Sequence, residues 1–225
     1  MQPKIIIQNV SKLYPTKGET VAALKGIHLT IEPGEFTAIA GPSGSGKSTL
    51  LNLLGGLDQP TSGKILFGDL DITLLSDTQL CEMRLRSIGY IFQAYNLIPV
   101  LSVIENVEYV MLLQGVEPKA RREKCLDILS EVGLSEHVQR LPLELSGGQQ
   151  QRVAVARAIV SEPSLVLADE PTANLDSGTA GNLLDLMAEL NQRRGVTFIF
   201  SSHDPLVLSR ARRVVKLHDG QVQKE

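Results

Sequence analysis

A glycine-rich segment at residues 41–49 constrains the fold of this chain more than any other stretch of its sequence. It matches the pattern G-x-x-x-x-G-K-[ST] and lies between the apolar run 36–40, which predicts a strand, and residues 47–54, which predict a helix. This context favours a phosphate-binding loop over a plain glycine-rich turn. The loop residues are Gly41, Pro42, Ser43, Gly44, Ser45, Gly46, Lys47, Ser48 and Thr49.

The residue types of this loop predict its chemistry. Glycines allow backbone N–H groups to converge on phosphate oxygens, and the N-terminus of the following helix adds a partial positive charge. We expect Lys47 to neutralise the terminal phosphates of a nucleotide and the Ser48 hydroxyl to bind Mg²⁺. The loop alone predicts only that a nucleotide binds.

The composition is that of an ordinary globular protein. Of the 225 residues, 43% are hydrophobic and 21% are charged, which suits one large domain or a core with an inserted lobe. The net charge of -3 predicts no nucleic-acid partner. Cys81 and Cys125 lack a CxxC spacing, so we expect free thiols in a reducing cytosol. Apolar runs are too short for a signal peptide or a membrane span, so work at a membrane would need a partner.

Strands and helices are expected to alternate along most of the chain. Apolar runs predict strands at 5–10, 28–31, 36–40, 64–67, 88–92, 165–168 and 196–200, and a closing hairpin around 214–221. Helical spacing predicts helices at 47–54, 103–113, 118–133, 152–160 and 179–190. This alternation predicts an α/β fold with a mostly parallel sheet covered on both faces. Because strand patterns disappear between 93 and 149, that region is expected to be an inserted α-helical lobe.

Two carboxylates follow the predicted strand 165–168. Asp169 and Glu170 would lie at the carboxyl edge of the sheet, where open α/β folds bind ligands. We expect Asp169 to hold Mg²⁺, usually through water, and Glu170 to polarise the attacking water. The alternative is that both residues cap or solvate a loop ahead of Pro171.

Two further polar residues end predicted strands and are expected at the same edge. Gln93 follows 88–92 and could reach the metal or the water, although it could also be a surface glutamine. His203 follows the apolar run that ends at 202, and Asp204 and Pro205 after it predict a helix start. This position places His203 near a γ-phosphate, although a lone histidine there is often structural.

A second loop of small residues lies at the end of the helical lobe. Leu145, Ser146, Gly147, Gly148 and Gln149 precede the predicted helix 152–160, which suits anion binding at a helix N-terminus. Ser146 could instead be a plain N-cap. This loop is predicted to be remote from the phosphate loop of its own chain, and a head-to-tail pair of chains would bring each loop to the other chain's γ-phosphate.

The phosphate loop and the LSGGQ stretch together resemble the ATPase subunits of ABC transporters, and the resemblance covers nearly the whole chain. It implies a P-loop NTPase (RecA-like) core at 1–93 and 150–225, including an N-terminal antiparallel β subdomain, with a helical subdomain at 94–149 and ATP and Mg²⁺ as ligands. It also implies that Tyr14 stacks on adenine, that Gln93 links the nucleotide state to the helical lobe, and that Asp176 lines a dimer interface. From the residues alone, Tyr14 could be a core aromatic and Asp176 a helix cap.

Residues 92–99, 101–107 and 168–177 look like one branch of that family, which contains lipoprotein-releasing, macrolide-export and peptide-export ATPases and the cell-division ATPase. Ala173 stands where a glycine is common. The resemblance implies an ATP-hydrolysing homodimer on the cytoplasmic face of the inner membrane, which drives a transmembrane permease for export or lipoprotein extraction. The alternative is a mechanical signalling ATPase that regulates cell-wall hydrolysis. A generic P-loop kinase is disfavoured by the second loop. Tyr95, Leu97 and Pro99 are candidates for permease docking, or for burial in the lobe.

Overall fold

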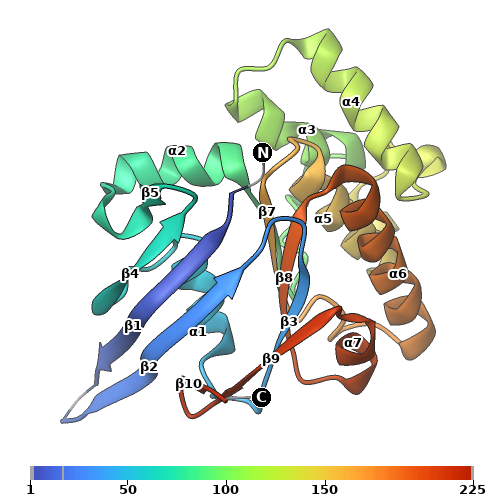
Figure 1. The fold of residues 1–225 in the computed structure, drawn as a ribbon. Coiled ribbons are helices and arrows are strands. Elements are labelled where there is room, and N and C mark those ends of the chain that lie inside the picture. The colour runs from blue at the N-terminus through green and yellow to red at the C-terminus, as the bar shows by residue number, and fades with distance from the viewer. Residues whose placement is uncertain (1–2, 17, 224–225) are drawn as a thin grey trace.

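The structure, a computed structural model, describes residues 3–16 and 18–223 and contains two β-sheets with helices packed on them (Figure 1). The first sheet has the strand order β2-β1-β4-β5 and is antiparallel, with β1 at Ile5–Pro15, β2 at Thr20–Ile31, β4 at Ser62–Phe67 and β5 at Leu70–Asp71. The second has the order β10-β9-β3-β8-β7-β6, with β3 at Phe36–Ala40, β6 at Ile88–Ile91, β7 at Leu165–Asp169, β8 at Thr197–Ser202, β9 at Arg213–His218 and β10 at Gln221–Val222.

The second sheet is parallel except for the closing hairpin of β9 and β10, which confirms the predicted sheet and hairpin. Its central strands β3, β7 and β8 are buried on both faces, since successive residues of a strand point to opposite sides and nearly all residues of these strands are buried. In β7, Leu165 and Leu167 pack into one apolar cluster, whereas Val166 and Ala168 pack into another. The apolar runs that predicted strands are therefore runs buried on two sides.

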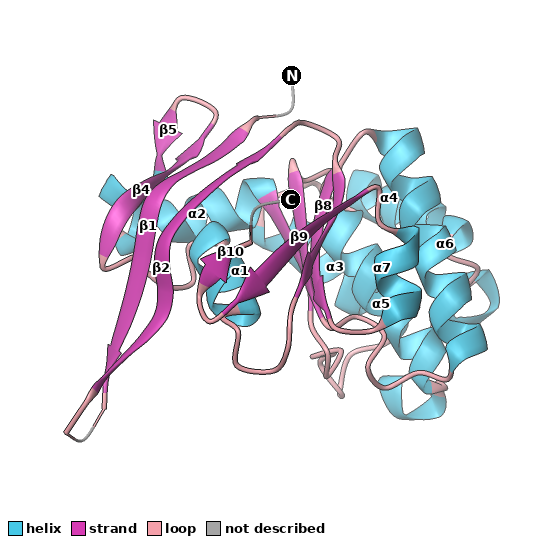
Figure 2. Cartoon of the chain, turned by 60° about the horizontal axis from the view of Figure 1, so that its bottom comes forward, coloured by secondary structure: helices cyan, strands magenta, loops and turns pink. Residues whose placement is uncertain are grey.

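Helices cover the two faces of this sheet and form a lobe beyond it (Figure 2). Helix α1 packs between the two sheets, and α2 packs at the outer edge of that same cluster. Helices α3, α4 and α5 pack on one another in the lobe, and their apolar cluster continues onto β7 and β8. The helices are α1 at Lys47–Leu54, α2 at Asp77–Ser87, α3 at Val103–Leu113, α4 at Pro118–Glu131, α5 at Gly147–Ile159, α6 at Ser177–Arg194 and α7 at Pro205–Arg210.

Most predicted elements are present, and the bounds of α1 and α3 agree with their predictions. The predicted start of α5 at residue 152 was wrong, since the helix begins at Gly147. Ser146 and Gln149 form a capping box there, which satisfies the free N–H groups of the first turn and allows two glycines to be helical. The strands predicted at 5–10 and 28–31 were too short, because register shifts in β1 interrupt the alternation of apolar residues.

Helix α2 was not predicted, because only Leu80 and Met83 of its residues are buried and the apolar period is weak. The domain limits proposed from the sequence remain a prediction, and α5, which leads from the lobe back to the sheet, begins within the range 94–149. Cys81 is exposed and Cys125 is buried, and both are free thiols. Within residues 3–16 and 18–223, no helix combines the length and the apolar composition needed to cross a bilayer.

Candidate nucleotide site

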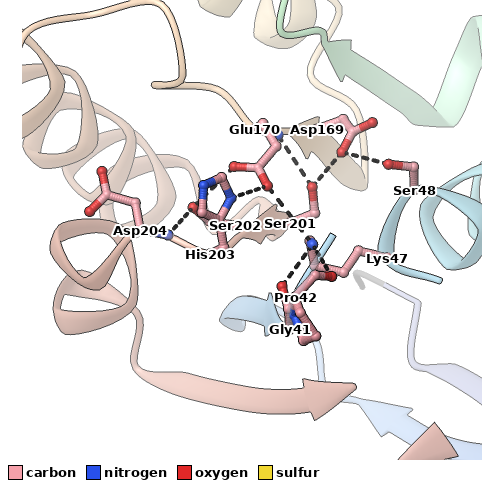
Figure 3. Close-up of polar contacts among 10 residues, drawn as sticks. All are labelled: Gly41, Pro42, Lys47, Ser48, Asp169, Glu170, Ser201, Ser202, His203 and Asp204. Carbon is pink, nitrogen blue, oxygen red and sulfur yellow. Dashed lines mark hydrogen bonds and ion pairs between the residues drawn. The ribbon is translucent and has the colours of Figure 1, made fainter. Parts of the chain in front are cut away.

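The phosphate loop lies between β3 and α1 and is shaped by glycine. Gly46 is the N-cap of α1 and has a φ of 103°, in the left-handed region that favours glycine. A Cβ on Gly41 would lie 2.2 Å from the Leu217 carbonyl oxygen. Lys47, the first residue of α1, is 8% exposed, and its Nζ donates to the carbonyls of Gly41 at 2.8 Å and Pro42 at 3.1 Å (Figure 3). The Lys47 side chain therefore lies against the phosphate loop.

Ser48 and Asp169 present oxygen atoms to each other from α1 and the end of β7. The Ser48 hydroxyl donates to Asp169 Oδ1 at 3.1 Å, and the Ser201 hydroxyl donates to the same oxygen (Figure 3). A hydroxyl and a carboxylate are ligands that suit Mg²⁺, which takes its remaining ligands from phosphates and water. Among the described residues, no group of three or more His, Cys, Asp or Glu side chains is placed to hold a metal ion.

Glu170 adopts an unusual backbone conformation that turns its side chain into the site. Its φ is 46°, and its N–H donates to the Ser201 carbonyl at 3.2 Å. In a regular strand, Asp169 and Glu170 would point to opposite faces. The left-handed turn breaks that alternation, so both carboxylates lie beside the phosphate loop (Figure 3). A left-handed glutamate costs on the order of 1–3 kcal/mol, which the surrounding contacts must offset.

Three groups surround the Glu170 carboxylate, whose side chain is 17% exposed. Lys47 Nζ lies 4.0 Å from Oε1, and His203 Nδ1 lies 2.9 Å from the same oxygen. The Ser202 hydroxyl donates to Oε2 at 3.3 Å. The carboxylate is thus held between the phosphate loop and the end of β8. The sequence indicated no role for Ser201 and Ser202, although their place at the end of a strand beside β7 was a usable signal.

Of the residues described above, Lys47, Ser48, Glu170 and His203 line a cleft of about 580 Å³. Gln93 and His203 are exposed in its wall, and the Gln93 carbonyl accepts a hydrogen bond from Asn174 Nδ2 at 2.9 Å. The opposite wall comes from β2 and the turn between β9 and β10. No local motif predicts this wall, whose main residues are Val21, Ala22, Ala23, Lys25, Asp219 and Gly220.

Tyr14 lies at the margin of the cleft. It pairs with Val21 across β1 and β2, and its hydroxyl donates to Asp58 Oδ2 at 2.7 Å. Burial of the phenol and its hydrogen bond to Asp58 raise the pKa of Tyr14. Its role in binding adenine remains a prediction.

At the start of α5, Ser146 is exposed and residues 147–149 are half-buried, and none of these four residues lines the cleft. Gln149 Oε1 accepts from the Ser146 N–H at 2.9 Å, which leaves its Nε2 amide to face His137 Nε2 at 2.8 Å. Since an amide nitrogen only donates, the imidazole Nε2 is the acceptor in this contact. His137 thereby orients the glutamine that caps α5.

Asp176 is the N-cap of α6 and accepts from the Thr179 N–H at 3.0 Å. Hydrogen bonding to Thr179 lowers the pKa of this carboxyl. A Cβ on Gly148 would lie 2.5 Å from Thr179 Cγ2, so the starts of α5 and α6 are adjacent. The structure therefore groups Asp176 with the Ser146 loop, while the phosphate loop, Asp169, Glu170 and His203 form a separate group.

Comparison with known protein families identifies the family to which this chain belongs. The sequence profile of a family described as "ABC transporter" matches residues 24–173, which is most of the chain. The chain belongs to the ABC transporter family. The lipoprotein-releasing system ATP-binding protein LolD of Legionella pneumophila (strain Lens) is 45% identical over 215 residues, which cover 96% of this chain and 95% of that protein.

Another relative is much longer than this ABC cassette. The macrolide export ATP-binding/permease protein MacB of Syntrophobacter fumaroxidans is 45% identical over 223 residues, but the chain spans only 31% of its length. Among solved structures, a dimer of the ATP-binding cassette MJ0796 in a post-hydrolysis state, bound to ADP and Pi, superposes with a TM-score of 0.90. It is 40% identical, and the match covers 98% of this chain and 97% of that one. The predicted family and the predicted P-loop NTPase fold are confirmed.

Proposed function

We propose that this ABC cassette binds Mg-ATP in the cleft, hydrolyses it within a dimer, and thereby drives a transmembrane permease. The observation that carries the proposal is the convergence of Lys47, Ser48, Asp169 and Glu170 at one sheet edge, with the Ser146 loop outside the cleft. Similarity to LolD, which is named as an ATP-binding protein, and to the dimer of MJ0796 bound to ADP and Pi supports this activity.

Each group in the cleft has a step to perform. When phosphates enter, Lys47 exchanges its bonds to the loop carbonyls for bonds to phosphate oxygens, which carry full charge. Ser48 and Asp169, with Gln93, would hold Mg²⁺, which neutralises charge on the phosphates when it is bound. Glu170 accepts a proton from the attacking water. His203 Nδ1 lies 2.9 Å from Glu170 Oε1, so the imidazole helps to hold the carboxylate that accepts this proton.

The start of α5 supports a role for a second copy of the chain. Ser146, Gly147 and Gly148 present a helix N-terminus, which favours an anion, and they lie outside the cleft of their own chain. A two-fold pair would place each start of α5 over the other chain's γ-phosphate. Asp176, at the adjacent start of α6, would then lie in the same interface.

A groove of about 330 Å³ beside β6 supports permease docking. Its apolar lining includes Leu85, Ile88 and Phe92, and Arg157 lies at its wall. Arg157 donates to the carbonyl oxygens of Tyr95 and Asn96, both of which have positive φ, so the groove is joined to the segment after Gln93. Tyr95 and Leu97 are half-buried and Pro99 is exposed, so mainly Pro99 offers a free surface there. We propose that a permease helix enters this groove.

The similarity to LolD and MacB supports export or lipoprotein extraction as the transport direction, with the cassette at the cytoplasmic face of the inner membrane. Reconstitution of the cassette with its permease tests this part. ATP-dependent removal of cargo from the membrane is the expected result. Hydrolysis that moves no cargo would favour mechanical signalling through the membrane partner.

Dimerisation can be tested by introducing a negative charge at Ser146. The background is Glu170→Gln, which is expected to bind ATP without hydrolysing it. Both Ser146→Asn and Ser146→Asp preserve an N-cap for α5, but only aspartate adds a negative charge. Light scattering with saturating Mg-ATP should show a dimer for the asparagine variant and a monomer for the aspartate variant, because the aspartate would face a triphosphate. Equal dimerisation of the two variants would exclude the proposed contact with the partner's ATP.

A further inference from the structure

Asp58 joins the end of β1 to the loop that follows α1. Its Oδ2 accepts from the Tyr14 hydroxyl at 2.7 Å, and its Oδ1 accepts from Lys12 Nζ at 2.5 Å and from the Gln59 N–H at 2.7 Å. Lys12 Nζ also donates to the Gln59 carbonyl at 2.7 Å. Both charged side chains are largely shielded, with 12% of Lys12 and 29% of Asp58 exposed. This is a connected network and not a solvated surface pair.

The network places a cation on one face of the Tyr14 ring. Lys12 Nζ lies over the ring, 4.9 Å from its centroid, so a cation already covers one face. A planar base would have to stack on the opposite face. Tyr14 is the cross-strand partner of Val21, which lines the cleft, so Tyr14 lies next to the cleft wall formed by β2.

Asp58 also ties Tyr14 to the helix that begins at the phosphate loop. It follows α1 by four residues, and the Leu57 N–H donates to the Asn52 carbonyl of α1 at 2.9 Å. The N–H of Leu13 donates to the Thr61 hydroxyl at 2.9 Å, which anchors β1 to the same loop. The distance between Tyr14 and Lys47 is therefore set through α1 and this loop as well as through the sheets.

The protonation states suit this arrangement. Burial opposes ionisation of Asp58, but the hydrogen bonds from Lys12 and Tyr14 outweigh it and lower the pKa of the carboxyl. Burial and the Asp58 hydrogen bond raise the pKa of Tyr14. At neutral pH the phenol is thus a donor and the carboxylate an acceptor, so the bond between them keeps one direction.

We propose that Asp58 is a positioning residue for nucleotide selection: it holds the Tyr14 ring, backed by Lys12, at a fixed distance from the phosphate loop so that the opposite face accepts a purine base. This inference rests on the proposed binding of ATP in the cleft. It predicts that Asp58 affects recognition of the base and not of the phosphates.

Binding of two probes separates these effects. Calorimetric titration of the full chain with Mg-ATP and with inorganic tripolyphosphate should be compared for Asp58→Ala, Tyr14→Phe and the double variant. Each single variant should weaken ATP binding by about threefold to tenfold, the range for one hydrogen bond, and leave tripolyphosphate binding within about twofold. The double variant should be no weaker than Asp58→Ala alone, because the hydrogen bond that Tyr14→Phe removes is already absent in Asp58→Ala.

A control variant and the outcomes that would contradict the proposal complete the test. Glu32→Ala breaks an exposed lysine–carboxylate pair with Lys4 beside the same sheet and should change neither affinity. Equal weakening of ATP and tripolyphosphate by Asp58→Ala, or effects that multiply in the double variant, would overturn the proposal. Tyr14→Ala tests base binding by Tyr14 separately from the positioning role of Asp58. If this variant leaves ATP affinity unchanged, Tyr14 does not bind the base. If it weakens ATP while Asp58→Ala does not, only the positioning role fails.

Discussion

Replacing Glu170 with glutamine should separate ATP hydrolysis from ATP binding. Glutamine has the length of glutamate and can still accept from Ser202, which lies 3.3 Å from the carboxylate. It cannot take a proton from water at neutral pH. Since a positioned acid or base contributes about 10²–10⁴-fold, we expect turnover to fall by about that factor.

ATP affinity should not fall with it. Lys47 Nζ lies 4.0 Å from Glu170 Oε1, and both side chains are mostly buried. Two unit charges at that distance interact by about 4 kcal/mol at an effective dielectric constant near 20, which is an upper bound on their net coupling. Because glutamine releases Lys47 and removes a negative charge from a cleft that receives a triphosphate, affinity should stay constant or rise by a few-fold.

Single-turnover release of phosphate and equilibrium binding of ATP measure the two quantities. Glu162→Gln is a matched control, because Glu162 also has a positive φ, 54°, and lies 3.3 Å from a lysine, but it is exposed on the surface. The control should hydrolyse ATP at the wild-type rate. Turnover of Glu170→Gln within tenfold of wild type would refute the role of the base, and a loss of affinity as large as the loss of turnover would refute the separation.

Three further predictions concern stability and the start of α5. Gly89→Ala should lower the free energy of unfolding by about 2–3 kcal/mol in urea titrations, since its Cβ would lie 2.1 Å from the Ala158 carbonyl oxygen; unchanged stability would mean that β6 and α5 can separate freely. His137→Phe should reduce ATP turnover without changing ATP binding to the monomer, because it removes the acceptor for Gln149; equal loss of both would contradict a role confined to the start of α5. The folded-state pKa of Asp58 lies below the ordinary 3.8, so its stabilising effect is present above that value and is lost as pH falls through the depressed pKa; stability of the Asp58→Ala variant should decline less steeply in acid, as thermal unfolding would show.

Short-range patterns predicted much of the site. The strand–loop–helix context placed Lys47 and Ser48 at the start of α1, and the end of an apolar strand placed Asp169 and Glu170 at the sheet edge. These predictions succeeded because a glycine-rich loop or a buried parallel strand is recognisable within ten residues. Helix α2 had a readable start too, since Ser76 and Gln79 form a capping box. Its weak apolar pattern concealed it.

Other parts of the site depend on residues that are far apart in the sequence. Tyr14 meets Asp58 across 44 positions, and Ser201 meets Asp169 across 32. The wall of the cleft on β2 has no motif, because the packing of β2 beside the phosphate loop determines which of its residues line the cleft.

The sequence by itself determined the family, the phosphate loop and the chain order of most strands and helices, since these follow from residue type and local spacing. Only the tertiary structure decided that Glu170 turns toward Lys47 and that Asp58 accepts a hydrogen bond from Tyr14. The physical reason is that hydrogen bonds and ion pairs act over a few ångströms in space, and the packing of two sheets around α1 determines which distant residues come that close.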